Sequence, residues 1–292
     1  MYDVKIVNGL IIDGTGNPGY AADVGIVGDQ IIAIGDLSDA TSRETVDASG
    51  KVVAPGFVDM HTHSDLAVLF DPLTNSKIFD GVTTEVVGNC GIGVAPVSEA
   101  NRQLLIDYLG TRMIGNLPVK IELNWSSMAE YLDYVRRHPP ALNVCALLAQ
   151  GAVRIAVMGF DKQAPTNRQL SEMKSLVAAG MAEGAVGFSS GLIYMPGEFS
   201  TTDELAELAK EIRPYQGFYV SHIRNESEGV FDALEEALTI GEKAGVPVHV
   251  SHLKVAGQSV WGRSPELLAR IDKANQDGVE TTFDLYPYTS GM

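Results

Sequence analysis

His61 and His63 have the spacing of two metal ligands at the end of a strand. They are separated by one residue and follow the largely apolar stretch 55–60. In an extended chain, residues two apart point to the same side, so both imidazoles can reach one point. Buried neutral histidines need polar partners, and a metal ion is the simplest partner that two of them can share. The pair therefore predicts a metal site, with two polar residues capping a strand as the alternative.

Cys90 is a further candidate ligand, because it lies where the apolar stretch 84–87 ends in a loop. A thiolate at this position would bind Zn²⁺ strongly and could bridge two ions. The alternative is a small buried apolar side chain, which is the usual role of a lone cysteine. The neighbouring Gly88, Asn89 and Gly91 indicate a shaped loop rather than a core segment. That loop favours the ligand.

His222 and His252 occur in the same local pattern. Each follows an apolar stretch and a serine, and each has a basic residue two positions later, Arg224 and Lys254. Histidines at the ends of successive parallel strands of a barrel would lie on the same rim. His249 is expected to point to the other side of its strand and is not counted. Nitrogen and sulfur donors favour zinc, whereas carboxylates suit hard cations. The predicted ligand set is His61, His63, Cys90, His222 and His252.

The elements that must position these residues alternate between strand and helix after Pro55. Continuous apolar runs predict strands at 57–60, 84–87, 144–149, 185–188, 218–221, 246–251 and 281–285. Helical patterns lie between them, one of them beginning at a capping box of Thr166 and Gln169. Repeated strand–helix units favour a parallel sheet, and a closed (β/α)8 TIM-type barrel of eight units takes about 250 residues. The fold class predicted is α/β, with about seven of the eight barrel units present.

A doubly wound open sheet is the competing fold. It would need a glycine-rich phosphate loop after its first strand, whereas the first strand here ends in the histidine pair. Residues 1–54 differ from the rest, because short β-branched runs broken by Gly, Asn and Asp predict antiparallel strands and hairpins. The predicted domains are therefore 1–54 and 55–292.

Composition narrows the classes of partner. The formal net charge of −16 argues against nucleic acid and anionic membrane surfaces. The chain begins without a signal-peptide pattern and has no apolar run of about 18 residues. Its two cysteines form no disulfide framework, and Cys145, inside an apolar stretch, is expected to pack in the core. A cytoplasmic protein with a small-molecule substrate is the expectation.

Several separated motifs resemble a known family. Stretches 3–9 and 55–63, together with the later histidines, resemble the metal-dependent amidohydrolase superfamily. More narrowly, the chain resembles the N-acyl-D-amino-acid deacylases (the D-aminoacylase family). The motifs that carry this resemblance are 88–91, 187–194, 222–226 and 286–288.

The resemblance implies a barrel with a small β-sandwich built from both chain ends, of which residues 1–54 would be a part. It implies zinc, with one tight site at Cys90, His222 and His252 and a second, weaker site at His61 and His63. Cys90 would take the bridging role that a carboxylated lysine has in many relatives. The general-base aspartate of the family would lie beyond residue 292, so no catalytic residue is assigned and the chain is expected to be truncated.

The resemblance also implies an activity, namely hydrolysis of N-acyl-D-amino acids to a carboxylate and a D-amino acid. Lys254 is the first candidate to bind the substrate carboxylate, with Tyr286 and Arg224 as further candidates. One alternative is hydrolysis of a cyclic amide, as in dihydroorotases and hydantoinases, or of a dipeptide. Another is an inactive metal-binding fragment. An incomplete barrel exposes a strand edge, which predicts self-association.

Overall fold

The computed structural model describes residues 1–114 and 122–288 of the chain. It separates into two compact units, Met1–Phe57 and Val58–Met292, which are described one at a time. Among the described helices, none has the length and apolar character that crossing a membrane requires.

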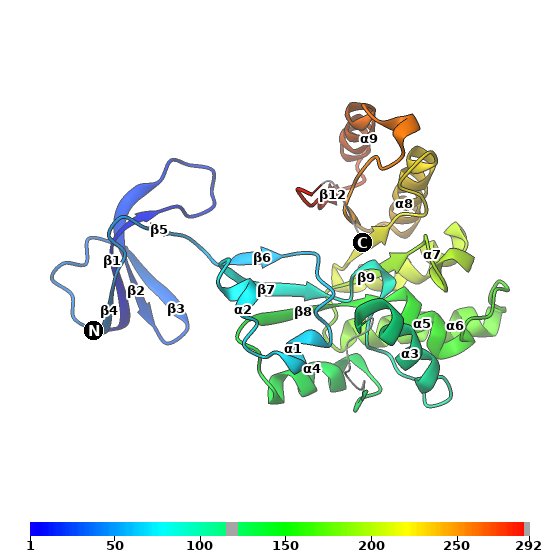
Figure 1. Cartoon of the computed structure of the whole chain (residues 1–292), viewed down its shortest axis with the longest axis horizontal. Coiled ribbons are helices and arrows are strands. Elements are labelled where there is room, and N and C mark those ends of the chain that lie inside the picture. The colour runs from blue at the N-terminus through cyan, green and yellow to red at the C-terminus, as the bar shows by residue number, and fades with distance from the viewer. Residues whose placement is uncertain (115–121, 289–292) are drawn as a thin grey trace. The chain divides into compact units, whose positions relative to one another are not determined.

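The N-terminal unit is a five-stranded sheet (Figure 1). Its strands are β1 (Tyr2–Ile11), β2 (Tyr20–Val27), β3 (Gln30–Gly35), β4 (Ser42–Asp47) and β5 (Val52–Val53). Strands β1, β2 and β3 form antiparallel hairpins, as predicted, but β4 and β5 both pair with β1 in parallel. The prediction of antiparallel strands throughout was wrong for these two, because a short β-branched run does not reveal whether its connection is a hairpin or a crossover.

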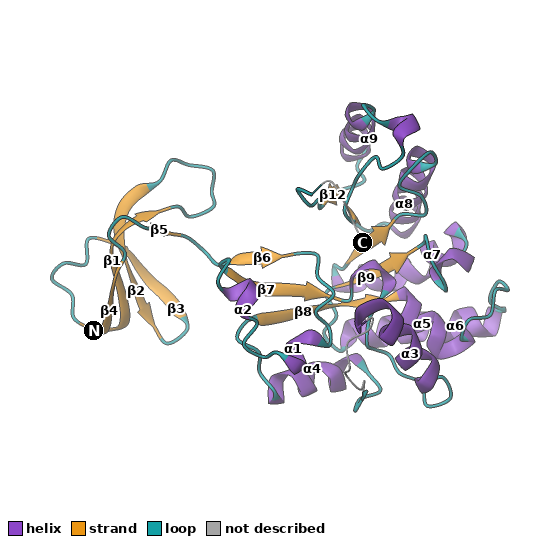
Figure 2. Cartoon of the chain, viewed as in Figure 1, coloured by secondary structure: helices purple, strands orange, loops and turns teal. Residues whose placement is uncertain are grey.

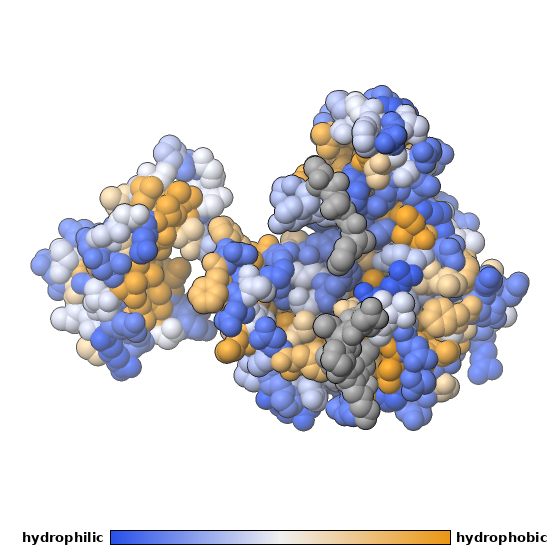
Figure 3. All heavy atoms as spheres, in the orientation of Figure 1, coloured by the Kyte–Doolittle hydropathy of each residue, from blue (hydrophilic) through white to orange (hydrophobic). Residues whose placement is uncertain are grey.

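Strand β1 runs without a break through Asn8 and Gly9. Asn8 adopts a left-handed backbone conformation, with φ of 61°, and the pairing register shifts between Ile6 and Gly9. A bulge of this kind lets a strand run through an Asn-Gly pair that would otherwise indicate a turn. Figure 3 shows apolar side chains on the surface of this unit, and Ile31, for example, is 63% exposed. The unit therefore buries little of its own apolar surface.

The C-terminal unit contains seven strands in sequential order (Figures 1 and 2). They are β6 (Phe57–Asp59), β7 (Val82–Val87), β8 (Asn143–Ala149), β9 (Gly187–Gly191), β10 (Phe218–His222), β11 (Val248–Val250) and β12 (Thr281–Phe283). Strands β7 to β12 pair in parallel. Sequential parallel order is that of a TIM barrel and not of a doubly wound sheet. The prediction of an incomplete barrel with seven strands is confirmed.

The helices follow the strands along the chain and pack against the sheet and each other. They are α1 (Ala67–Phe70), α2 (Asn75–Ile78), α3 (Arg102–Leu109), α4 (Met128–Arg137), α5 (Gln150–Met158), α6 (Asn167–Ala182), α7 (Thr202–Ala209), α8 (Val230–Ala244) and α9 (Ser264–Gln276). The capping box of Thr166 and Gln169 begins α6, as predicted. Gly245 ends α8 with φ of 69°, a left-handed conformation that glycine adopts without strain.

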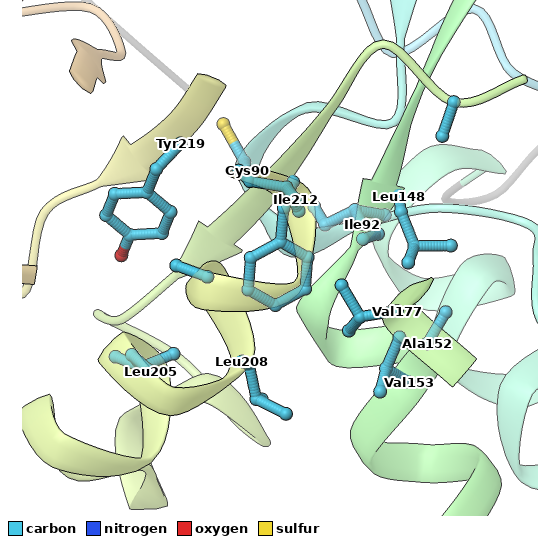
Figure 4. Packing of buried hydrophobic residues seen from close by; sticks show 14 of the residues in the cluster. Cys90, Ile92, Leu148, Ala152, Val153, Val177, Leu205, Leu208, Ile212 and Tyr219 are labelled. Atoms are coloured by element: carbon cyan, nitrogen blue, oxygen red, sulfur yellow. The ribbon is translucent and has the colours of Figure 1, made fainter. Parts of the chain in front are cut away.

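Two hydrophobic clusters hold this unit together. The larger lies between sheet and helices and includes Leu148, Val153, Val177 and Leu205 (Figure 4). The smaller centres on side chains of β7, β8 and β10, and Cys145 packs against it, as expected for a core cysteine. Apolar layers on both faces keep the strands rigid, so the residues just beyond the strand ends are held in fixed positions.

Candidate metal centre

Four strands supply the candidate ligands at their carboxyl ends. His61 and His63 follow β6, Cys90 follows β7, His222 is the last residue of β10 and His252 follows β11. In a barrel these ends form one rim, where side chains from distant parts of the chain meet. The structure therefore brings the five residues of the predicted ligand set to one place.

The Cys90 sulfur is common to two groups of possible ligand atoms. One group is His61, His63 and Cys90, and the other is Cys90, His222 and His252. Within each group, the ligand atoms lie within 4.8 Å of one another. The sulfur is 3.1 Å from His61 Nε2 and 3.5 Å from His252 Nε2. This arrangement suits a thiolate placed between two ions.

A buried nitrogen without a partner supports the fit of a metal to these residues. His222 Nε2 is buried and accepts or donates no hydrogen bond among the described residues, and its nearest carboxylate oxygen, Glu226 Oε1, is 3.8 Å away. A buried polar atom left unpaired costs about 1–3 kcal/mol. A cation on this nitrogen removes that cost, and the surrounding nitrogen and sulfur donors are those that zinc prefers.

Burial keeps two histidines of the site, His63 and His222, neutral. Burial, and to a smaller extent the nearby His252, lowers the pKa of His222 to about 3. Burial, and to a smaller extent the nearby His61, lowers the pKa of His63 to about 4. Burial raises the pKa of the Cys90 thiol well above its usual value, and a bound zinc ion reverses this preference because it deprotonates a coordinating thiol. Neutral imidazoles and a metal-stabilised thiolate are the forms that bind zinc.

The backbone around the ligands adopts conformations that few residues take. Cys90 and His252 have φ of 55° and 37°, in the left-handed region that is uncommon for residues other than glycine. Gly88 has φ of 80°, and a Cβ there would lie 2.3 Å from the backbone oxygen of Leu147. The Asn89 side chain donates to the backbone oxygens of Met60 and Val86. The loop is therefore held in one shape, which fixes the direction of the sulfur. Figure 4 shows the Cys90 sulfur pointing away from the packed aliphatic side chains.

Asp284 is a site residue that sequence reasoning missed. It directly follows β12, and its Oδ2 lies 2.9 Å from His61 Nδ1 and 3.0 Å from His249 Nε2. Its Oδ1 accepts a hydrogen bond of 2.7 Å from the backbone N–H of His252. Burial would raise the pKa of this carboxyl, but hydrogen bonds from His249 and His61 outweigh it and hold the pKa well below its usual range. Its place near the end of the last predicted strand, 281–285, was the signal that could have found it.

The contact with Asp284 settles which nitrogen of His61 is available to a metal. With Nδ1–H donated to the carboxylate, Nε2 carries the free lone pair and faces the Cys90 sulfur. Carboxylate–histidine pairs of this kind orient metal ligands in many proteins. His249, set aside in the sequence analysis, joins the same network and also contacts Thr282 Oγ1 at 2.8 Å.

Lys254 and Glu226 contact the opposite edge of the His252 ring. The Lys254 ammonium lies 3.0 Å from His252 Nδ1 and is hydrogen-bonded to Glu226, and it lies 5.4 Å from the centre of the Tyr286 ring. Glu226 Oε1 is 2.7 Å from His252 Nδ1. Burial would raise the pKa of Glu226, but hydrogen bonds from His252 and Lys254 outweigh it and lower the pKa to about 2. The carboxylate is therefore ionised at neutral pH and orients the imidazole.

Arg224 lies elsewhere. Its guanidinium pairs with Glu236 of α8 at 2.8 Å and donates to the backbone oxygens of Glu198 and Ser200, each at 2.9 Å. The nearby Glu226 pairs with Lys254 and not with Arg224. The structure thus does not bring Arg224 to the metal ligands, and its contacts are those of a residue that ties α8 to the loop before α7.

The ligands open into a cavity of about 740 Å³, a size typical of small-molecule sites. Its wall includes all five candidate ligands and Asp284. Aromatic and basic side chains complete the wall, among them Lys77, Arg112, Tyr194, Tyr286 and Tyr288. A ligand of small to medium size could enter and reach the sulfur and imidazoles from this side.

Comparison with known proteins agrees with this site. Residues 44–283 match the amidohydrolase family. A D-aminoacylase of Alcaligenes xylosoxydans xylosoxydans is 41% identical over 99% of this chain. A crystal structure of D-aminoacylase superposes over the whole of this chain with a TM-score of 0.90 and 38% identity. This chain covers 60% of the length of that structure. A zinc- and phosphonate-bound N-acyl-D-glutamate deacylase from Bordetella bronchiseptica superposes over 98% of this chain, and 59% of its own, with a TM-score of 0.87 and 41% identity.

The chain spans 58% of the length of the Alcaligenes enzyme. The match covers most of this chain, and the resemblance seen in its motifs is confirmed. The chain belongs to the amidohydrolase family.

Proposed function

We propose that this chain forms the metal-binding part of a zinc-dependent hydrolase that cleaves the amide bond of N-acyl-D-amino acids. The products would be a carboxylate and a D-amino acid. The observation that carries the proposal is the meeting of two ligand groups at the single Cys90 sulfur. Similarity to a D-aminoacylase and to an N-acyl-D-glutamate deacylase over nearly the whole chain supports it.

The chemistry follows from the roles of the donors. Cys90, His222 and His252 would hold the tighter ion, and His61 and His63 would serve a second, weaker site. Zinc, when bound, supplies a Lewis acid that polarises an amide carbonyl and lowers the pKa of water to about 7. Asp284 contacts Nδ1 of His61, and Glu226 contacts Nδ1 of His252. These two carboxylates keep the rings in the orientation that leaves Nε2 free for the metal. The general-base aspartate, expected beyond residue 292, stays a prediction.

For the substrate carboxylate we propose Lys254 with Tyr286. The ammonium lies next to a metal ligand and near the Tyr286 ring, which lines the cavity. Lys254 would exchange part of its contact with Glu226 for the substrate. Arg224 is left out of this proposal because Glu236 and two backbone oxygens already occupy its donors.

Cyclic-amide or dipeptide hydrolysis and an inactive metal-binding fragment remain the alternatives. Strand β9 ends in Ser190 and Gly191, so no lysine stands there to be carboxylated, which favours the cysteine-bridged subset. Assays with N-acetyl-D-methionine, its L-enantiomer and a hydantoin separate the classes. Equal rates on both enantiomers would contradict the proposal. Cytoplasmic location and self-association stay predictions.

The metal assignment is tested by comparing the two cysteines. We expect zinc, measured by elemental analysis after dialysis, to be retained by the wild type and lost or strongly reduced in Cys90→Ala. Cys145→Ala is the matched control, since Cys145 packs against the smaller hydrophobic cluster, and should keep its zinc. Zinc retained fully by folded Cys90→Ala would remove this residue from the ligand set.

A further inference from the structure

Arg112 is a basic residue on the wall of the metal-site cavity. It follows α3 along the chain, and its side chain is exposed. Its guanidinium carbon lies over the Tyr194 ring, 4.2 Å from the ring centre. This contact, a cation–π interaction, uses the face of the guanidinium. The N–H donors at its edge therefore remain available to a ligand.

Arg112 differs from the other cations near the ligands, because each of those has a carboxylate partner. Lys77 pairs with Asp59 at 2.6 Å, and Lys254 pairs with Glu226. Among the residues that the structure describes, no acidic side chain pairs with Arg112. An unpaired guanidinium in a cavity matches the planar, two-oxygen geometry of a carboxylate.

Tyr194 places this guanidinium close to the metal ligands. Its hydroxyl donates a hydrogen bond of 2.6 Å to the backbone oxygen of Cys90, and its ring centre is 5.2 Å from that of His222. The Arg112 guanidinium carbon is 4.2 Å from the Tyr194 ring centre, and that centre is 5.2 Å from the His222 ring centre. The guanidinium carbon therefore lies no farther from the His222 ring centre than these two distances combined. An extended chain covers about 3.3–3.6 Å per residue, so an acidic side chain of glutamate length or a succinyl acyl group, with a metal ligand at one end and a hydrogen bond at the other, is of the size of that gap.

Lys254 and Arg112 lie at the two ends of one series of contacts. Lys254 touches His252, whose ring is 4.3 Å from that of His222. His222 in turn contacts the Tyr194 ring, over which Arg112 lies. A substrate with its amide at the metal and its α-carboxylate near Lys254 would extend a further group towards Arg112.

We propose that Arg112 binds a second carboxylate of the substrate, carried by the amino-acid side chain or by the acyl group. The preferred substrates would then be dianionic N-acyl-D-amino acids. This inference rests on the proposed function and adds the substrate class to it. Arg112 would act as a specificity-determining residue, with Tyr194 holding its guanidinium in place.

The test measures binding to the zinc-loaded protein by isothermal titration calorimetry. N-acetyl-D-glutamate and N-acetyl-D-glutamine have nearly the same shape and differ in one charge, and N-succinyl-D-alanine and its succinamic analogue repeat the comparison on the acyl side. We expect the wild type to prefer the charged member of one pair by about tenfold, the effect of one charge-assisted hydrogen-bonded pair. The pair that shows the preference identifies which part of the substrate carries the carboxylate.

Variants separate this role from simple packing. Arg112→Gln should abolish the preference and leave the affinity for the neutral ligand nearly unchanged, whereas Arg112→Lys should keep part of it. Arg136→Gln removes an equal charge from an exposed pair on α4 and should change nothing. Equal affinity of the wild type for both members of both pairs would overturn the inference, as would equal weakening of charged and neutral ligands in Arg112→Gln.

The proposed function can fail separately. If N-acetyl-D-methionine is bound or hydrolysed but no charged ligand is preferred, only the assignment of Arg112 is wrong. If no N-acyl-D-amino acid binds the zinc-loaded protein, the proposed function is wrong and the substrate class falls with it.

Discussion

Replacing Asp284 with Asn tests whether a carboxylate outside the ligand set controls metal affinity. The two oxygens of Asp284 receive three donors, His61 Nδ1, His249 Nε2 and the backbone N–H of His252. An Asn side chain has one oxygen and one NH2 group. Whichever way the amide turns, either the two imidazoles or the His252 N–H must face a donor instead of an acceptor.

The expected cost follows from these contacts. A hydrogen bond to a charged group contributes about 1.5–3 kcal/mol, and losing an outer carboxylate partner of a metal-binding histidine typically lowers metal affinity by about 10- to 100-fold. The two figures agree, because tenfold corresponds to about 1.4 kcal/mol. We therefore expect Asp284→Asn to weaken zinc binding by one to two orders of magnitude without unfolding the barrel.

Zinc affinity is measured by competition with a chromophoric chelator at neutral pH, with circular dichroism as the check on folding. Asp277→Asn is the matched control, because Asp277 is exposed at the end of α9 and pairs with Lys273; its zinc affinity should equal that of the wild type. A folded Asp284→Asn variant with wild-type affinity would refute the claim that this carboxylate orients the ligands.

Three further predictions concern stability. Arg154 and Glu204 form an ion pair with side chains 0% and 3% exposed, so Arg154→Met, which strands a buried charge, should lower the free energy of unfolding by about 3–5 kcal/mol in urea; a loss near zero would contradict this. Burial raises the pKa of Asp65 from 3.8 to about 7. Between pH 4 and pH 7 this carboxyl is protonated in the native state but ionised in the unfolded state. Raising the pH over that range therefore lowers the contribution of Asp65 to the free energy of unfolding by roughly 4 kcal/mol. The stability advantage of Asp65→Asn, measured with chelator present, should grow over that range and stay constant above it, and a pH-independent difference would count against the assignment. Gly88→Ala should cost about 1–3 kcal/mol more than Gly278→Ala in thermal unfolding, because both have positive φ but only Gly88 meets a backbone oxygen of β8; equal losses would show that the loop can move.

The sequence alone was sufficient for the barrel order of the C-terminal strands and for the five candidate ligands, but not for Asp284 or for the parallel pairing of β4 and β5. Apolar runs of strand length, separated by helical patterns, predicted the seven strands of the C-terminal sheet. The predicted ends differ by a few residues, as at β9, which runs from Gly187 to Gly191 rather than ending at Phe188. The candidate ligands were found because each stands at a strand end, and parallel strands of a barrel bring those ends together. Both inferences depend only on residues that are close together in the sequence.

The tertiary structure alone decided which side chains touch. His61 and Asp284 are 223 residues apart, and their contact depends on the order and stagger of seven strands. The same is true of the pairing of Arg224 with Glu236 and of the position of Arg112 over Tyr194. A local pattern tells which face or end of an element a residue occupies. The direction of its polar atoms is set by the packed neighbours, and these neighbours come from distant segments that meet only when the sheet has formed.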